Sequence, residues 1–165
     1  RNAAGPHDRR VEKDARTGRF RGHPLVASPS LRVVTLVVVD TSVWQRRVQP
    51  GVGDSLGDAI DADAVAMVDP IELELLRSAW GSEDHDQIRE EYSALHRIPL
   101  DAEIGARAVE VQSLLARRGY QRGPSVTDLL AAAAAESAGA ELWHCDRHFE
   151  LIAEVTGQPV RRLGT

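Results

Sequence analysis

Four acidic residues stand at places in the sequence where side chains often do chemistry. Asp40 follows the apolar run LVVV, and Asp146 follows LWHC. Glu74 and Asp128 lie near the beginnings of two predicted helices, after AVAMVDP and RGPSV. Carboxylates held close together repel one another unless a cation neutralises them, and their oxygens select Mg²⁺ or Mn²⁺. Such ions bind phosphate oxygens and activate water, so the pattern favours metal-dependent phosphodiester hydrolysis.

Each acid also has a simpler interpretation. Asp40 and Asp146 could cap the helices that follow them. The sequence SVTD at 125–128 matches a capping box, in which the aspartate only faces the helix N-terminus. Glu74 could be an ordinary solvated side chain, and Glu72 is a rival for any role given to it. Three caps and a solvated side chain do not need to come from segments that meet at one edge, so the set as a whole favours a shared site.

Short β-branched runs alternate with helical patterns along the chain. The sequence predicts strands at 33–39, 64–68, 97–100, 141–145 and 158–163. Helices are predicted at 70–80, 82–96, from 101 to a stop at Gly119, at 125–140 and at 146–155. In the third of these, the apolar residues recur at steps of four, three and four and mark one helical face: Ile104, Ala108, Val111 and Leu115. This alternation predicts an α/β fold with a central parallel sheet of about five strands, covered on both faces. Ligands of such sheets gather at the carboxyl ends of the strands, where Asp40 and Asp146 are expected.

The near absence of lysine excludes most other enzyme classes that have an acidic residue at the end of a strand in a parallel sheet. Lys13 is the only lysine in the chain. A haloacid-dehalogenase-type phosphatase uses the acid after its first strand as a nucleophile, in a motif that resembles D-x-D-x-T. This chain has Ser42 in place of the second Asp. Such a phosphatase also needs a lysine to hold the phosphate. A receiver domain or a P-loop also needs one, and the dinucleotide-binding G-x-G-x-x-G is absent.

Composition and charge bound the remaining possibilities. Residues 1–32 carry eight Lys or Arg against three Asp or Glu, a net charge of +5. Because the whole chain has a net charge of −5, residues 33–165 have a net charge of −10. We expect residues 1–32 to be a disordered or non-native extension, or alternatively a basic arm that contacts RNA, and residues 33–165 to be one domain. The single cysteine, Cys145, indicates a reducing cytoplasm. The run at 33–39 is too short to span a membrane.

Four sequence motifs occur in one order: VVDTSVW, ELLRSA, PSVTDLLAAAAAESAG and HCDRHFELIAEVTGQPV. Together they resemble the PIN domains, and within these the VapC-type toxins of bacterial toxin–antitoxin pairs. The resemblance runs from Val34 to about Leu163 and implies a PIN-like α/β/α sandwich. It assigns the four family acids to Asp40, Glu74, Asp128 and Asp146. Many members have Thr where this chain has His144, which we interpret as a strand-end variation.

The resemblance implies a Mg²⁺- or Mn²⁺-dependent endoribonuclease that cleaves structured RNA, such as tRNA or rRNA, and inhibits translation. It also implies a homodimer and a VapB-type antitoxin partner. In this reading Asp40, Asp128 and Asp146 hold the metal, Glu74 orients or deprotonates the attacking water, and Thr41 and Ser42 fix the Asp40 loop. A binding module that docks RNA or antitoxin without cleavage is the main alternative, and a phosphatase is the weaker one.

An acidic domain that handles RNA must contact phosphates through local arginines. We expect these contacts from arginines close in sequence to the four acids, although each could be ordinary surface charge. The candidates are Arg46, Arg47, Arg117, Arg118, Arg122 and Arg147.

Overall fold

A computed structural model describes residues 34–164, so the prediction for residues 1–32 lies outside the described part and stays a prediction. Five strands form one sheet in the order β3-β2-β1-β4-β5, and every neighbouring pair is parallel. The strands are β1 (Val37–Val39), β2 (Val65–Met67), β3 (His96–Arg97), β4 (Glu141–His144) and β5 (Val160–Arg162). The predicted five-stranded parallel α/β fold is confirmed.

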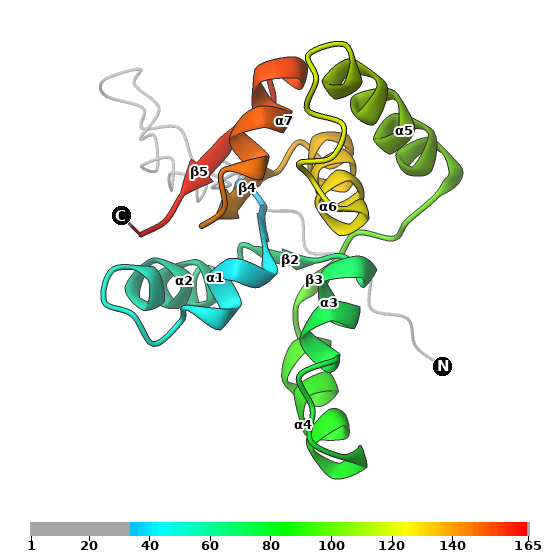
Figure 1. Ribbon diagram of the computed structural model, residues 1–165. Coiled ribbons are helices and arrows are strands. Elements are labelled where there is room, and N and C mark those ends of the chain that lie inside the picture. The colour runs from blue at the N-terminus through cyan, green and yellow to red at the C-terminus, as the bar shows by residue number, and fades with distance from the viewer. Residues whose placement is uncertain (1–33, 165) are drawn as a thin grey trace, which may run out of the picture. The chain divides into compact units, whose positions relative to one another are not determined.

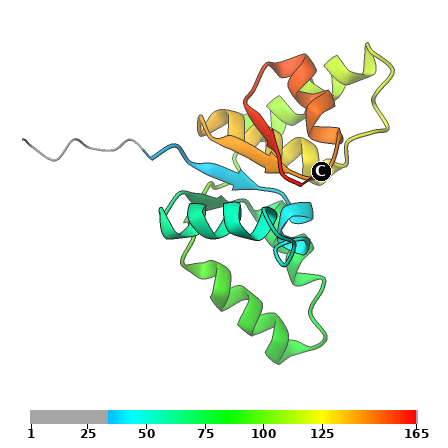
Figure 2. The same cartoon turned by 90° about the vertical axis from the view of Figure 1, so that its left-hand side faces the viewer.

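Seven helices of the described residues connect these strands (Figure 1). They are α1 (Thr41–Gln45), α2 (Val52–Asp61), α3 (Asp69–Leu76), α4 (Ser82–Ser93), α5 (Ala102–Ala116), α6 (Val126–Ser137) and α7 (His148–Thr156). Figures 1 and 2 show α5, α6 and α7 gathered on one side of the sheet, with α1, α2 and α4 on the other. Within residues 34–164 no helix is long and apolar enough to cross a membrane.

The predicted elements differ from the observed ones mainly at their ends. The first predicted strand, 33–39, is paired only over Val37–Val39, and the predicted helix at 146–155 begins at His148. Asp146 therefore lies in the connection before α7, where its Oδ1 accepts the backbone N–H of His148 at 3.1 Å. The predicted helix at 70–80 ends at Leu76, and α2 is a helix that the sequence reading did not predict.

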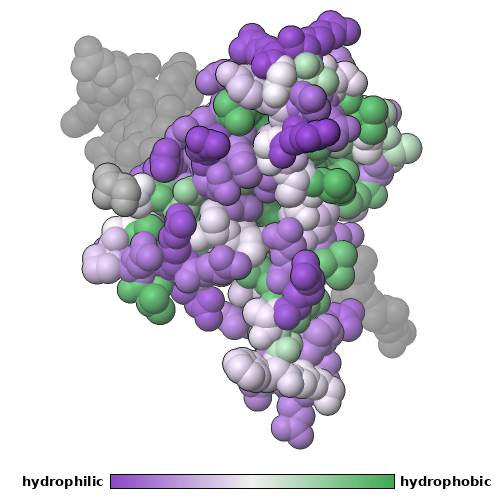
Figure 3. All heavy atoms as spheres, viewed as in Figure 1, coloured by the Kyte–Doolittle hydropathy of each residue, from purple (hydrophilic) through white to green (hydrophobic). Residues whose placement is uncertain are grey.

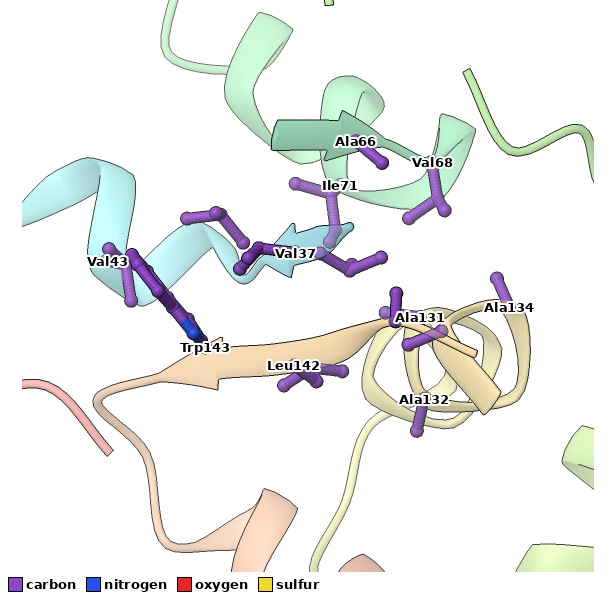
Figure 4. Packing of buried hydrophobic residues seen from close by; sticks show 14 of the residues in the cluster. Val37, Val43, Ala66, Val68, Ile71, Ala131, Ala132, Ala134, Leu142 and Trp143 are labelled. Atoms are coloured by element: carbon purple, nitrogen blue, oxygen red, sulfur yellow. The ribbon is translucent and has the colours of Figure 1, made fainter. Parts of the chain in front are cut away.

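The core is built mainly from aliphatic side chains, since only 4% of the residues are aromatic. The predicted stripe on α5, made of Ile104, Ala108, Val111 and Leu115, is buried throughout. On α6 the five consecutive alanines 131–135 are all buried, which brings this helix close to the sheet and to α5. Figure 4 shows side chains from β1, β2, α3 and α6 meeting around β1. This packing fixes the carboxyl end of β1.

The Ala face of α6 leaves no room for larger side chains. Ala132 is fully buried, so Ala132→Leu is expected to lower the free energy of unfolding by about 1–3 kcal/mol through overpacking. Ala106→Leu on α5 is the matched control, because Ala106 is exposed. Urea unfolding of both variants checks this expectation. Equal stability of the two variants would show that α6 packs more loosely than described.

Candidate active site at the carboxyl edge of the sheet

The carboxyl ends of β1 and β4 lie side by side at the centre of the sheet. The chain order reverses there, because β2 flanks β1 on one side and β4 flanks it on the other. Ligands of open α/β sheets bind at such a switch point. The Asp40 backbone N–H donates to the Trp143 carbonyl at 2.9 Å, which joins the end of one strand to the end of the other. Asp40 and Asp146 therefore leave the sheet at one place, as predicted.

Asp40 is a buried acid held by a short hydroxyl network. Only 5% of the residue is exposed, and it is the N-cap of α1. Its Oδ2 accepts the Ser42 hydroxyl and, at 2.9 Å, the Ser42 backbone N–H. The Ser42 Oγ in turn accepts the Cys145 backbone N–H at 3.0 Å. Asp40 is thus a cap of α1, as the simpler interpretation held, and the hydrogen bonds of Ser42 hold its carboxylate.

Electrostatics set Asp40 apart from an ordinary cap. Burial raises the pKa of its carboxyl, the hydrogen bonds from Ser42 oppose this, and the charge of Asp128 raises the pKa further. Among residues 34–164 no arginine or histidine forms an ion pair with Asp40. Asp40 therefore carries a poorly compensated negative charge beside a second acid.

Removing the Ser42 hydroxyl is expected to affect both stability and cleavage. Ser42→Ala leaves the Cys145 N–H without its acceptor and removes one of the two Ser42 hydrogen bonds to Asp40 Oδ2, which should cost about 1–3 kcal/mol of unfolding free energy. Because Asp40 also loses its fixed orientation, RNA cleavage should fall by about tenfold or more. Urea unfolding and an RNA cleavage assay measure the two effects. Ser55→Ala in α2 is the control, and wild-type behaviour of Ser42→Ala would contradict the role given to this hydroxyl.

The structure distinguishes Glu74 from its rival Glu72. The Glu74 Oε2 accepts the Thr41 hydroxyl at 2.8 Å, which brings α3 to the residue that follows Asp40. Glu72 pairs instead with Arg97 at 2.6 Å, next to the Arg97–Asp69 pair. Thr41 therefore positions Glu74. Of the two glutamates, Glu74 is the one joined to the Asp40 loop, as the sequence motif suggested.

Asp128 and Asp146 are joined by a histidine that the sequence reading missed. The His148 Nδ1 lies 3.5 Å from Asp128 Oδ2 and 3.6 Å from Asp146 Oδ2. Asp128 also forms the predicted capping box, since its Oδ2 accepts the Ser125 backbone N–H at 2.7 Å. Nothing in the local sequence marks His148 beyond its place two residues after Asp146. Only the approach of α7 to the N-terminus of α6 reveals its position.

His144, which the sequence reading noticed, has a different environment. It is fully buried at the end of β4, and within residues 34–164 neither ring nitrogen has a hydrogen-bond partner. Its ring packs against Phe149 with the centroids 5.5 Å apart. Burial lowers the pKa of the His144 imidazole. It is a buried strand-end side chain, as interpreted.

The candidate arginines fall into two groups. Three have protein partners: Arg46 donates to the Cys145 carbonyl at 3.2 Å, Arg47 donates to the Trp44 carbonyl at 3.1 Å, and Arg118 pairs with Glu154 at 3.7 Å. The other three are exposed and, in the described part of the chain, pair with no carboxylate; they are Arg117, Arg122 and Arg147. The second group is free to contact a ligand.

The donor atoms suit a hard divalent cation, although they do not form a closed site. In residues 34–164 no three His, Cys, Asp or Glu side chains converge tightly enough to hold a metal ion. Hydrogen bonds engage Oδ2 of Asp40 and Oδ2 of Asp128. A buried carboxylate with a raised pKa, beside a second acid, fits such a cation.

Comparisons with known proteins agree with this geometry. The family model for the PIN domain matches residues 37–155, a range that contains Asp40, Glu74, Asp128 and Asp146. The ribonuclease VapC18 of Mycobacterium tuberculosis is 39% identical over 123 residues, which cover 73% of this chain and 90% of that relative. This chain is a VapC-type PIN domain. The ribonuclease VapC51 of the same organism is also 39% identical, over 74% of this chain and 88% of that relative.

A solved structure supports the fold of this PIN domain. The chain in the crystal structure of VapBC2 from Rickettsia felis, bound to a DNA fragment from their promoter, superposes with a TM-score of 0.63. The match covers 78% of this PIN domain and 99% of that chain at 15% sequence identity. The VapC-type resemblance seen in the four sequence motifs is confirmed.

Proposed function

We propose that this PIN domain is a Mg²⁺- or Mn²⁺-dependent endoribonuclease toxin. It acts in the cytoplasm, cleaves structured RNA such as tRNA or rRNA, and thereby inhibits translation. The observation that carries the proposal is the buried, uncompensated Asp40 carboxylate beside Asp128. The identity to VapC ribonucleases supports the same reaction.

The four acids have separate roles in the proposed reaction. Asp40, Asp128 and Asp146 hold the cation directly or through water. When bound, that cation neutralises charge on the phosphate oxygens and stabilises the leaving oxygen. Glu74, oriented by the Thr41 hydroxyl, positions the attacking water and takes its proton. In-line attack of this water on phosphorus leaves a 5′-phosphate and a 3′-hydroxyl.

His148 lies close to two of the four acids, Asp128 and Asp146. Its Nδ1 lies 3.5 Å from Asp128 and 3.6 Å from Asp146, which come from different segments of the chain, so the imidazole borders both carboxylates. The backbone N–H of His148 also donates to Asp146. Asp146 therefore keeps its place although it lies in a connection and not in a helix.

We further propose that the chain forms a homodimer and that a VapB-type antitoxin neutralises it. The structural neighbour from Rickettsia felis is a VapBC complex, which supports an antitoxin partner. Light scattering tests the dimer, since a solution mass of twice the 18.0 kDa of one chain is expected. A single-chain mass would contradict it.

The activity is tested by incubating the purified protein with total RNA, either with Mg²⁺ or with a chelator. Discrete fragments with 5′-phosphate ends are expected only when Mg²⁺ is present. Equal cleavage in the chelator would overturn the metal dependence. Binding without cleavage would favour the non-cleaving module, and turnover of a small phosphomonoester would favour the phosphatase.

A further inference from the structure

The connection between α5 and α6 is a basic segment in an acidic domain. Residues 117–123, RRGYQRG, contain three arginines and no acidic residue, whereas residues 33–165 carry a net charge of −10. Tyr120 lies among these arginines with 41% of its surface exposed. Figure 3 shows strongly hydrophilic side chains gathered where α5 and α7 approach this connection. Arginines interleaved with an exposed aromatic ring are typical of surfaces that bind single-stranded nucleic acid.

The segment has a fixed backbone and adjoins the acidic site. The Tyr120 N–H donates to the Leu115 carbonyl at 2.9 Å, and the Gly123 N–H donates to the Tyr120 carbonyl at 3.0 Å. A Cβ atom built on Gly123 would lie 3.9 Å from the His148 ring. The same ring reaches Asp128 and Asp146 through its Nδ1. Tyr120 therefore belongs to a segment that passes close to His148, the residue that borders two acids of the site.

A second exposed aromatic, Trp80, provides a contrast. It is 98% exposed between α3 and α4. However, it shares a surface pocket with Glu83 and Asp84, and its backbone N–H donates to the Asp84 carboxylate at 2.8 Å. A phosphate backbone is repelled by these carboxylates, whereas Arg117 and Arg122 attract it to Tyr120. Exposure alone therefore does not distinguish the two rings, but the surrounding charge does.

We propose that Tyr120 stacks on an unpaired base of the RNA substrate while Arg117 and Arg122 contact its phosphates, so that the strand entering the site is single-stranded. This inference rests on the proposed function and deepens it. Stacking requires a base face that is free, which a duplex does not offer. Because every base has such a face, Tyr120 positions the strand without selecting a sequence.

Binding is measured separately from cleavage, in the Asp40→Asn background, by fluorescence anisotropy with a labelled unstructured oligoribonucleotide of about 12 nucleotides. Tyr120→Ala is expected to raise Kd by about 5- to 100-fold. Tyr120→Phe keeps the ring and should restore binding to within about twofold. Trp80→Ala removes an exposed aromatic outside the basic segment and should leave Kd unchanged. A duplex of the same length should bind more weakly than the single strand.

Salt dependence separates the roles of the arginines and the tyrosine. Loss of one phosphate contact lowers the slope of log K against log salt by about 0.7–1, which is expected for Arg122→Ala. Arg89→Ala, at an exposed arginine on α4, is the matched control. Tyr120→Ala should weaken binding without changing the slope, because stacking releases no counterions.

Three results would overturn the inference. These are an unchanged Kd for Tyr120→Ala, the absence of any oligonucleotide binding by the parent protein, and stronger binding of the duplex. A changed mass of Tyr120→Ala in light scattering, with Kd unchanged, would assign this ring to a protein interface instead. Wild-type protein that fails to cleave RNA but binds it through Tyr120 would refute the nuclease proposal and leave this inference standing.

Discussion

Asp40→Asn is expected to lower RNA cleavage by about a thousandfold or more, since it removes the charge that would hold the cation at the end of β1. The variant should keep its fold. Asn is as good an N-cap as Asp, so the hydrogen bond from the Ser42 backbone N–H to this position can persist. Asp58→Asn, an exposed position on α2, is the matched control. Wild-type cleavage by the Asp40→Asn variant would refute the assignment of Asp40.

The same substitution should stabilise the protein when no divalent cation is present. Because the folded-state pKa of Asp40 is raised above its ordinary value of 3.8, its contribution to stability is fully present below that pH. That contribution is lost as pH rises through the folded-state pKa. At neutral pH the buried charge of Asp40 therefore lowers the free energy of unfolding of the wild type, and the variant lacks this charge. Urea unfolding should show the variant to be more stable at about pH 7, with the difference disappearing by about pH 4.

Cation binding should reverse this order. Under the proposed function Mg²⁺ binds the folded wild type and not the unfolded chain, so it should raise the Tm of the wild type and leave that of Asp40→Asn nearly unchanged. Loss of activity together with a gain in metal-free stability is a signature of a functional charge, which a purely structural cap would not give. A variant that is less stable than the wild type at neutral pH would mean that the Asp40 charge stabilises the fold, which would contradict the raised pKa of this carboxyl.

Periodicity and topology were sufficient to predict most of this fold. The stripe of Ile104, Val111 and their neighbours predicted the buried face of α5, because a helix has one face toward the core. The parallel sheet predicted that Asp40 and Asp146 meet, because the carboxyl ends of parallel strands share an edge. Both inferences depend only on local patterns and on the parallel arrangement of the strands.

The helix α2 was missed because its glycines hide its pattern. Val52, Leu56 and Ala59 have helical spacing and are buried, but Gly53 and Gly57 lower the helix propensity of the segment. Tertiary contacts explain one of these glycines. A Cβ at Gly53 would lie 2.2 Å from the Arg47 carbonyl oxygen, so only glycine fits there. The packing of α2 therefore requires Gly53, the same residue that lowers the helix propensity of this segment.

The candidate site was predictable as a set of acids but not as a set of contacts. The acids were found from their places at element ends. The link through His148 depends on how α6 and α7 meet, and neither helix encodes this by itself. Likewise, the preference for Glu74 over Glu72 came from a family motif, whereas its physical reason is the Thr41 hydroxyl on a distant segment. Long-range geometry of this kind has no local signature.

Glu74→Gln is the second variant with a large expected effect, a fall in RNA cleavage of about 10²- to 10⁴-fold. The glutamine keeps the size of the side chain, and its amide oxygen can still accept the Thr41 hydroxyl, so the fold should not change. It cannot take a proton from the attacking water. The loss should therefore appear in kcat, measured with a defined RNA substrate, while the affinity for RNA stays close to that of the wild type.

Glu72→Gln makes the same chemical change two residues away on α3. Its carboxylate pairs with Arg97, which is 40% exposed, so the loss should cost about 1 kcal/mol of stability or less and leave cleavage unchanged. The pair of variants separates a catalytic carboxylate from a structural one, since both remove one negative charge from the same helix. If cleavage depended on Glu72 and not on Glu74, the hydrogen bond to Thr41 would be structural, and the Arg97 cluster would become the second acidic position of the site.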